Sequence, residues 1–203
     1  MKSILALLLL SLMPLHVLNA DEPCKCKDPK APHHYRYNQK HETASGKYHA
    51  AAHPISAADI ISWQKKYTGA TKALKASPDK SRMAGTPEDT MYTLKGFMWY
   101  VKHEAGGPDP DCDFHIEIGP QNTSGKRAVV EVTKDNCNLQ QEILDTMDAH
   151  GYSLKKEFTK PIPCTVTGLG FYDGVHPPSG HGRRGKTTFS SWELHPVINI
   201  KFN

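Results

Sequence analysis

Acidic and histidine residues alternate with apolar ones in segments whose composition favours β-strands. Asp113 and His115 stand two positions apart. Glu193 and His195 repeat this spacing near the end of the chain. Because successive side chains of a strand point to opposite faces, the two members of each pair share one face. Glu131 stands on the polar face of a third such segment. If the three strands adjoin, these side chains converge.

Carboxylates and imidazoles together are ligands that zinc and other divalent metals take from proteins, and they also transfer protons in catalysis. The sequence therefore predicts a divalent metal site, with zinc or calcium as the ion. The predicted ligands are Asp113, His115, Glu131, His176, Glu193 and His195. The other interpretation is that these residues lie on the solvated face of an antiparallel sheet.

A polar and basic loop follows the fourth predicted strand and supplies further candidates. His176 in this loop could complete the metal site. Arg183 and Arg184 could hold an anion such as phosphate, since guanidinium groups bind oxyanions through paired N–H donors. With Glu131 and Glu193, these two arginines are the candidate catalytic residues. The alternative is a basic loop whose charges only keep it solvated.

The elements that would position these residues follow from periodicity. Ser56 followed by Asp59 resembles a capping box, and apolar residues then recur at helical spacing, which predicts a helix over about 57–67. Asn138 with Gln141 predicts the start of a second helix in the same way. Strands are predicted over 91–103, 113–118, 127–133, 164–172 and 192–202.

The predicted order from the first strand is β-β-β-α-β-β. This is the order of the OB-fold, a small five-stranded Greek-key barrel. Gly96, in the middle of the long first strand, predicts a bend or bulge where one strand serves two sheets. We therefore expect a mainly β protein with an OB-like barrel, and the alternative is another small α+β sheet.

Three segments precede the barrel domain, which spans residues 90–203. Residues 1–20 have the layout of a secretory signal peptide cleaved near Ala20, so we expect a secreted or periplasmic protein. Residues 21–55 hold five of the 12 histidines and almost no large apolar residues, which predicts a disordered His- and Lys-rich arm. Residues 56–89 are predicted to form a helix followed by a polar linker.

Composition excludes several classes of protein. Beyond the signal peptide, no stretch approaches the roughly 20 apolar residues of a membrane span, so we expect no transmembrane segment in the mature chain. A net charge of +4, with one lysine inside the signal peptide, is too small to indicate nucleic acid binding.

The five cysteines predict disulfides in an oxidising compartment. In one scheme Cys24 or Cys26 ties the arm to the domain, and an odd cysteine remains.

Several of these motifs resemble a family of small exported bacterial proteins whose activity is not settled. The matching segments are 113–118 (DFHIEI), 130–132 (VEV), 166–173 (VTGLGFYD) with His176, and 192–197 (WELHPV) with its Glu-Leu-His-Pro motif. The resemblance covers about residues 88–200 and does not include the arm. It implies that the six predicted ligands belong to one constellation.

The element order also resembles that of the thermonucleases, exported OB-fold phosphodiesterases that use calcium, although this likeness is one of topology only. The sequence thus supports three hypotheses. The first is a metal-binding barrel domain, and the second is a metal-dependent phosphodiesterase. The third is a module that binds oligosaccharide, nucleic acid or protein. For the module, Trp99, Tyr100 and Tyr172 are the candidate contact residues if they are exposed.

Overall fold

The computed structural model describes residues 25–27, 35–42, 51–76, 81–105, 110–122, 125–176, 178–179, 185–187 and 189–203. The predicted signal peptide and the candidate residues Arg183 and Arg184 lie outside the described residues. In the part of the chain that is described, no helix combines the length and the apolar character that crossing a bilayer requires.

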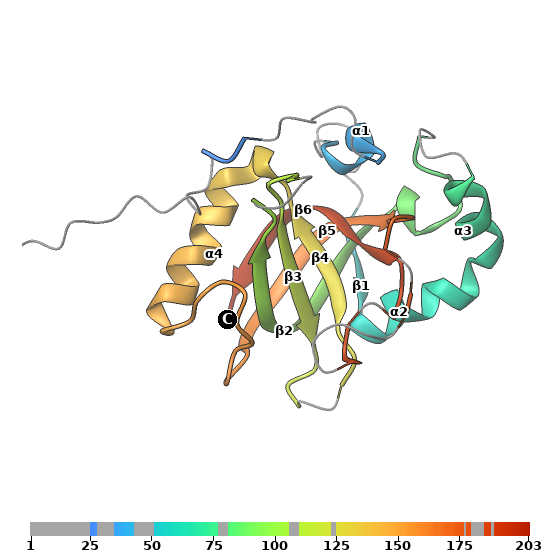
Figure 1. The fold of residues 1–203 in the computed structure, drawn as a ribbon. Helices are drawn as coiled ribbons and strands as arrows, with labels where there is room; N and C mark the ends of the chain where they lie inside the picture. Colours follow the sequence, from blue (N-terminus) through green and yellow to red (C-terminus); the bar gives the residue numbers. More distant parts are fainter. Residues whose placement is uncertain are drawn as a thin grey trace, which may run out of the picture.

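Five strands close into a β-barrel, and one further short strand joins it (Figure 1). The order around the barrel is β2-β3-β4-β6-β5, closed by pairing of β5 with β2, and β1 pairs in parallel with β2. The strands are β1 His53–Ile55, β2 Met91–His103, β3 Phe114–Gly119, β4 Ala128–Val132, β5 Ile162–Tyr172 and β6 Trp192–Phe202. Helix α4 (Cys137–Ala149) lies between β4 and β5 in the chain. The predicted mainly β barrel and its element order are confirmed.

Strand β2 belongs to both sides of the barrel. Its residues 91–98 pair with β5, and its residues 97–103 pair with β3. Gly96 lies next to this transition, where an added Cβ would stand 2.7 Å from the Ile118 side chain. Glycine therefore allows β2 and β3 to approach closely at the bend, as the sequence predicts.

One face of each barrel strand points into the apolar core. Phe114, Ile116 and Ile118 of β3 are fully buried there, and Val130 of β4 and Leu194 of β6 join them. Because side chains alternate along a strand, the intervening residues of these three strands share the opposite, outer face. Four of the six residues predicted as ligands are among these intervening residues, namely His115, Glu131, Glu193 and His195.

Both predicted helices are present, but they begin differently. Helix α2 (Ala57–Lys66) begins with the predicted capping box, in which Ser56 and Asp59 each accept a hydrogen bond from the other's backbone N–H. Helix α4 continues directly from a 3-10 turn, so helical backbone begins before Asn138. Asn138 and Gln141 therefore do not cap α4, and Gln141 donates a hydrogen bond within the helix instead.

A third helix, α3 (Thr68–Lys75), occupies part of the segment predicted as a linker. Leu74 of α3 is fully buried, and Thr71 accepts a hydrogen bond from the indole of Trp192 at 3.3 Å. These are contacts with distant parts of the chain, so the local pattern does not reveal them. Short 3-10 turns are η1 (Pro87–Asp89) and η2 (Lys134–Asn136).

Two short elements lie in the segment predicted as an arm. One is β1, and the other is helix α1 (Tyr37–Lys40), which lies beside one end of the barrel (Figure 1). Arg36 holds α1 in place through a buried ion pair with Glu88 and a 3.2 Å hydrogen bond to the carbonyl of Tyr172. Charge pairing, rather than apolar burial, orders this stretch, and the apolar composition of the arm gives no sign of it.

The cysteines follow the scheme predicted from the sequence. The disulfide Cys26–Cys112 ties the arm to the barrel domain. Cys137 is also disulfide-bonded, and Cys164 is a free thiol. Burial raises the pKa of the Cys164 thiol to about 12, which makes it unreactive at neutral pH.

Candidate functional site

Three ligand groups meet where β3, β4 and β6 adjoin. Asp113 directly precedes β3, Glu131 lies in β4 and His195 lies in β6. The antiparallel register sets His115 opposite Glu131, and β4 pairs in parallel with β6. One ligand atom from each of the three groups lies within 4.8 Å of the other two, and all three residues are buried. The group could hold a metal ion.

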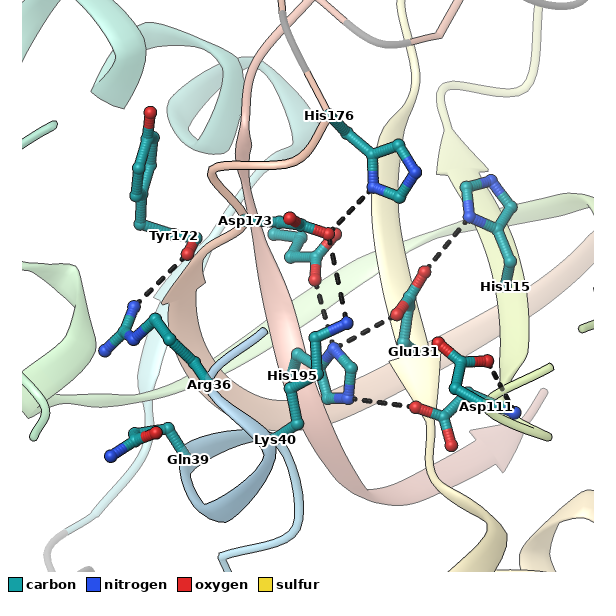
Figure 2. Close-up of polar contacts among 12 residues, drawn as sticks. Arg36, Gln39, Lys40, Asp111, His115, Glu131, Tyr172, Asp173, His176 and His195 are labelled. Atoms are coloured by element: carbon teal, nitrogen blue, oxygen red, sulfur yellow. Dashed lines mark hydrogen bonds and ion pairs between the residues drawn. The ribbon is translucent and has the colours of Figure 1, made fainter. Parts of the chain in front are cut away.

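The imidazole of His195 is the centre of this cluster (Figure 2). Its Nδ1 lies 3.1 Å from an oxygen of Glu131 and 3.1 Å from an oxygen of Glu193, and its Nε2 lies 3.3 Å from Oδ2 of Asp113. Burial alone would lower the pKa of His195, but the three surrounding carboxylates outweigh burial and raise it well above its ordinary value. Without a metal, the imidazole is therefore the cation that balances these acids.

Two atoms of the cluster have no hydrogen-bond partner among the described residues. They are Oδ2 of Asp113 and Nε2 of His195, which are buried and face each other as an ion pair at 3.3 Å. The other oxygen of Asp113 accepts a hydrogen bond from the backbone N–H of Lys134 at 3.1 Å. Buried polar atoms without a hydrogen bond are rare in proteins and need an explanation.

Glu131 connects the cluster to a second histidine. Its Oε1 lies 3.2 Å from Nδ1 of His115, while its Oε2 contacts His195. Burial would raise the pKa of Glu131, but the two histidines hold it well below its ordinary value. Burial raises the pKa of Glu193 to about 7, with the charge of Glu131 as the next cause. Two adjacent carboxylates thus differ widely in proton affinity.

An open cleft of about 340 Å³ lies against the cluster. Most of its lining side chains are charged or polar. They include Lys40, Lys102, Glu104, Asp111, His115, Glu131, Asp173, His176, Ser190, Ser191 and Glu193. Asp113 and His195 do not line the cleft, so they lie deeper in the protein than Glu131 and Glu193, which do.

Asp173 organises another part of the cleft. Its Oδ2 lies 2.8 Å from Nδ1 of His176 and 4.0 Å from Nζ of Lys40 (Figure 2). Burial would raise the pKa of Asp173, but His176 and Lys40 hold it below its ordinary value. The hydrogen bond to Asp173 in turn raises the pKa of His176 to about 9. Asp173 and His176 lie in the loop that follows β5, and Lys40 reaches in from α1.

The structure brings together five of the six residues predicted as ligands, which are Asp113, His115, Glu131, Glu193 and His195. His176 lines the same cleft but contacts Asp173 and stands outside the three-residue group. Whether any of the six binds a metal stays a prediction.

Sequence reasoning missed several residues of the cleft, of which Asp111 and Lys40 are two examples. Asp111 stands two positions before Asp113, and the spacing that identified Asp113 could have identified it. Burial, with the charge of Asp113 as the next cause, raises the pKa of Asp111 to about 6. Lys40 carries no local signal, because only the folding of the arm onto the barrel brings it to the cleft.

No protein-family model matches this chain, and neither the curated proteins nor the solved structures contain a significant match. The resemblance of segments 113–118 and 192–197 to small exported bacterial proteins therefore stays a prediction.

Proposed function

We propose that this protein binds a divalent metal ion through Asp113, Glu131 and His195. The observation that carries the proposal is the facing pair of buried atoms, Oδ2 of Asp113 and Nε2 of His195, which are 3.3 Å apart and lack hydrogen-bond partners among the described residues. A tetrahedral zinc ion with ligand distances of about 2.0–2.1 Å separates its ligand atoms by about 3.3 Å. The spacing of this pair is compatible with such a site.

The surroundings of His195 favour the same assignment. Histidines that bind metals through one ring nitrogen usually donate the other N–H to a carboxylate, which fixes the tautomer. If Nε2 binds the ion, Nδ1 donates to Glu193, whose oxygen lies 3.1 Å away. One imidazole and two carboxylates suit zinc better than calcium, because calcium takes six to eight oxygen ligands.

Metal analysis of the purified chain tests the proposal. We expect zinc to copurify in stoichiometric amount, and zinc added after chelation to raise Tm by several degrees. His195→Gln and Asp113→Asn should remove both effects, because each deletes one ligand. Calcium and magnesium at the same concentration should raise Tm less.

Two exposed residues provide matched controls. His53→Gln removes a histidine from β1, and Asp148→Asn removes a carboxylate from α4, so both should leave zinc binding unchanged. The proposal fails if the chain contains no metal and no divalent ion raises Tm. It also fails if the control variants lose as much zinc as the cluster variants.

A second candidate is a metal-dependent hydrolase of phosphodiesters. The observation that favours it is that Glu131 belongs both to the cluster and to the wall of the cleft, so a bound ion would lie next to a space for substrate. Incubation with nucleic acids and bis(p-nitrophenyl) phosphate, with zinc, calcium or magnesium, tests this activity. Hydrolysis that survives His195→Ala would contradict this site. The candidates Arg183 and Arg184 lie outside the described residues.

The third hypothesis, a binding module with an aromatic contact surface, is not supported. Trp99, Tyr100 and Tyr172 are at most 3% exposed, so they pack inside the protein and offer no surface for stacking. As to location, we propose that the protein works in an oxidising compartment outside the cytoplasm. The disulfide Cys26–Cys112 supports this, since such bonds are rare in reducing compartments.

A further inference from the structure

Lys40 is a cation that the arm supplies to the cleft. The residue is 6% exposed, and its side chain lines the cleft. Its Nζ points toward Asp173, whose Oδ2 is 4.0 Å away (Figure 2). No described residue accepts a hydrogen bond from Nζ, although an ammonium group carries three N–H donors. Lys40 is therefore held in the cleft by charge rather than by hydrogen bonds.

Several carboxylates attract Lys40 at once. Burial alone would lower the pKa of Lys40, but four carboxylates outweigh burial and raise it above its ordinary value. These are, from the largest effect to the smallest, Asp173, Glu131, Glu193 and Asp111. The ammonium group therefore stays charged and balances part of the negative charge of these acids.

The metal ion and Lys40 would depend on the same acids. Glu131 is one of the three proposed ligands, and it is also one of the carboxylates that attract Lys40. Glu193 attracts Lys40 as well, and it lies 3.1 Å from Nδ1 of His195. Two cations that share carboxylates repel each other, and solvent screens this repulsion little when the groups are buried.

The backbone of α1 is fastened to the barrel beside the metal cluster. Arg82 donates to the carbonyl of Gln39 at 2.7 Å and to the carbonyl of His195 at 2.8 Å. One guanidinium group thus bridges the residue before Lys40 to a proposed metal ligand. The fold therefore sets the position of Lys40 relative to the cluster.

We propose that Lys40 is a tethered cation that competes with the divalent ion, so that docking of α1 on the barrel lowers the metal affinity of the cluster. This inference rests on the proposed metal site and names how that site is regulated. Because coupling between two binding events is reciprocal, a bound ion weakens the seating of α1 by the same factor. A ligand that draws α1 off the barrel would thereby strengthen metal binding.

The zinc affinity of the full chain, measured at neutral pH by competition with a chelator, tests the proposal. Lys40→Met keeps the aliphatic stem and removes the charge, so it should bind zinc about tenfold more tightly than the native chain. Lys40→Arg keeps the charge and should bind zinc as the native chain does. The gain should vanish when His195→Gln is added to Lys40→Met, because the ion then lacks a ligand of the proposed cluster.

Two other lysines provide controls. Lys102 also lines the cleft, but its Nζ lies 2.5 Å from Glu104 and its side chain is 41% exposed. Lys102→Met should therefore raise zinc affinity less than about threefold, since solvent screens this charge. Lys65 of α2 is exposed and does not line the cleft, so Lys65→Met should leave zinc affinity unchanged.

Hydrogen exchange of the native chain tests the reciprocal effect, and it does not depend on a variant that folds. The amides of Gln39 and Lys40 donate to the carbonyl of Arg36. The amide of His41 donates to the carbonyl of Tyr37 in the same way. Zinc should speed exchange at these amides severalfold and should not speed exchange in α4.

Three results would overturn the proposal. They are native zinc affinity in folded Lys40→Met, a gain in Lys40→Arg or Lys102→Met that equals the gain in Lys40→Met, and zinc that leaves exchange in α1 unchanged or slows it. Absence of zinc binding in every chain would refute the metal site and this proposal together. Equal zinc affinity in the native chain and Lys40→Met would refute the competition alone, so the two failures are distinguishable.

Discussion

Two groups of buried charged side chains lie near opposite ends of strand β3, and they differ in how completely their atoms are paired. Near the β3–β4 loop, Arg127 donates to Glu117 at 3.0 Å and to Glu157 through its other terminal nitrogen. At the other end, Asp113 and His195 face each other at 3.3 Å without a hydrogen bond among the described residues. Arg127 and Glu117 are as deeply buried as Asp113 and His195, so burial alone does not separate the two groups.

The difference separates a group that serves the fold from one that is ready for a ligand. In the Arg127 group, charged donors and acceptors bind one another, and such a closed arrangement needs nothing further. In the Asp113–His195 group, three carboxylates surround one imidazole, and two buried atoms that face each other at 3.3 Å as an ion pair have no hydrogen bond among the described residues. Buried polar atoms that lack a hydrogen bond, in a cluster beside an open cleft, are what a metal or substrate would use.

The largest expected effect comes from breaking the closed group, which consists of Arg127, Glu117 and Glu157. Arg127→Met should lower the free energy of unfolding by about 3 to 5 kcal/mol, because it leaves Glu117 buried without its cation. Chemical denaturation monitored by circular dichroism measures this change. Zinc binding should persist in the folded fraction, because Arg127 contacts Glu117 and Glu157 and none of the three proposed ligands.

An exposed lysine provides the control for this prediction. Lys155→Met should change the free energy of unfolding by less than about 0.5 kcal/mol. If Arg127→Met is no more destabilising than this control, the closed group does not support the fold, and the contrast with the Asp113–His195 group disappears.

A smaller effect is expected from a substitution in the open group, which consists of Asp113, Glu131, Glu193 and His195. Asp113→Asn keeps the size of the side chain and a hydrogen-bond acceptor for the backbone of Lys134. His195 also keeps Glu131 and Glu193 as counter-charges. Without metal, the free energy of unfolding should therefore change by about 1 kcal/mol or less. With zinc present, the variant should lack the stabilisation that the native chain gains. A loss as large as that of Arg127→Met would show that Asp113 belongs to a structural ion pair.

Much of the open group could be predicted from the sequence, because strand alternation is a local property. Asp113 and His115 share a face whatever the partner strand is, and so do Glu193 and His195. The sequence left the convergence of these faces conditional on the three strands adjoining, and the structure places β3, β4 and β6 side by side. Glu117 shows the limit of this reasoning, since it lies on the same face as His115 but pairs with Arg127, a choice that depends on tertiary register.

The order of residues 35–42 in the arm and of α3 in the linker could not be predicted in the same way. Their order depends on single long-range contacts, such as Arg36 with Glu88 and Thr71 with Trp192. Low apolar content correctly indicates that these segments have no core of their own, but it does not show whether charged side chains anchor them elsewhere. Lys40 reaches the cleft by this route, which leaves no periodic signal.

The smallest expected effect is a pH dependence of the free energy of unfolding. The contact of His176 with Asp173 in the cleft should produce it, and the closed group should not. Asp173 raises the folded-state pKa of His176 to about 9, above its ordinary value of about 6.5. A raised pKa means that the contact stabilises the fold fully below pH of about 6.5 and loses this contribution as pH rises through about 9. The difference in unfolding free energy between the native chain and His176→Gln should therefore shrink from pH 6.5 to pH 9.5. The change should be modest, because His176 is 67% exposed and solvent screens the pair.

The effect of Arg127→Met should stay constant over the same range, since an arginine remains protonated throughout. A His176→Gln difference that does not vary with pH would show that the Asp173 contact does not hold the imidazole charged.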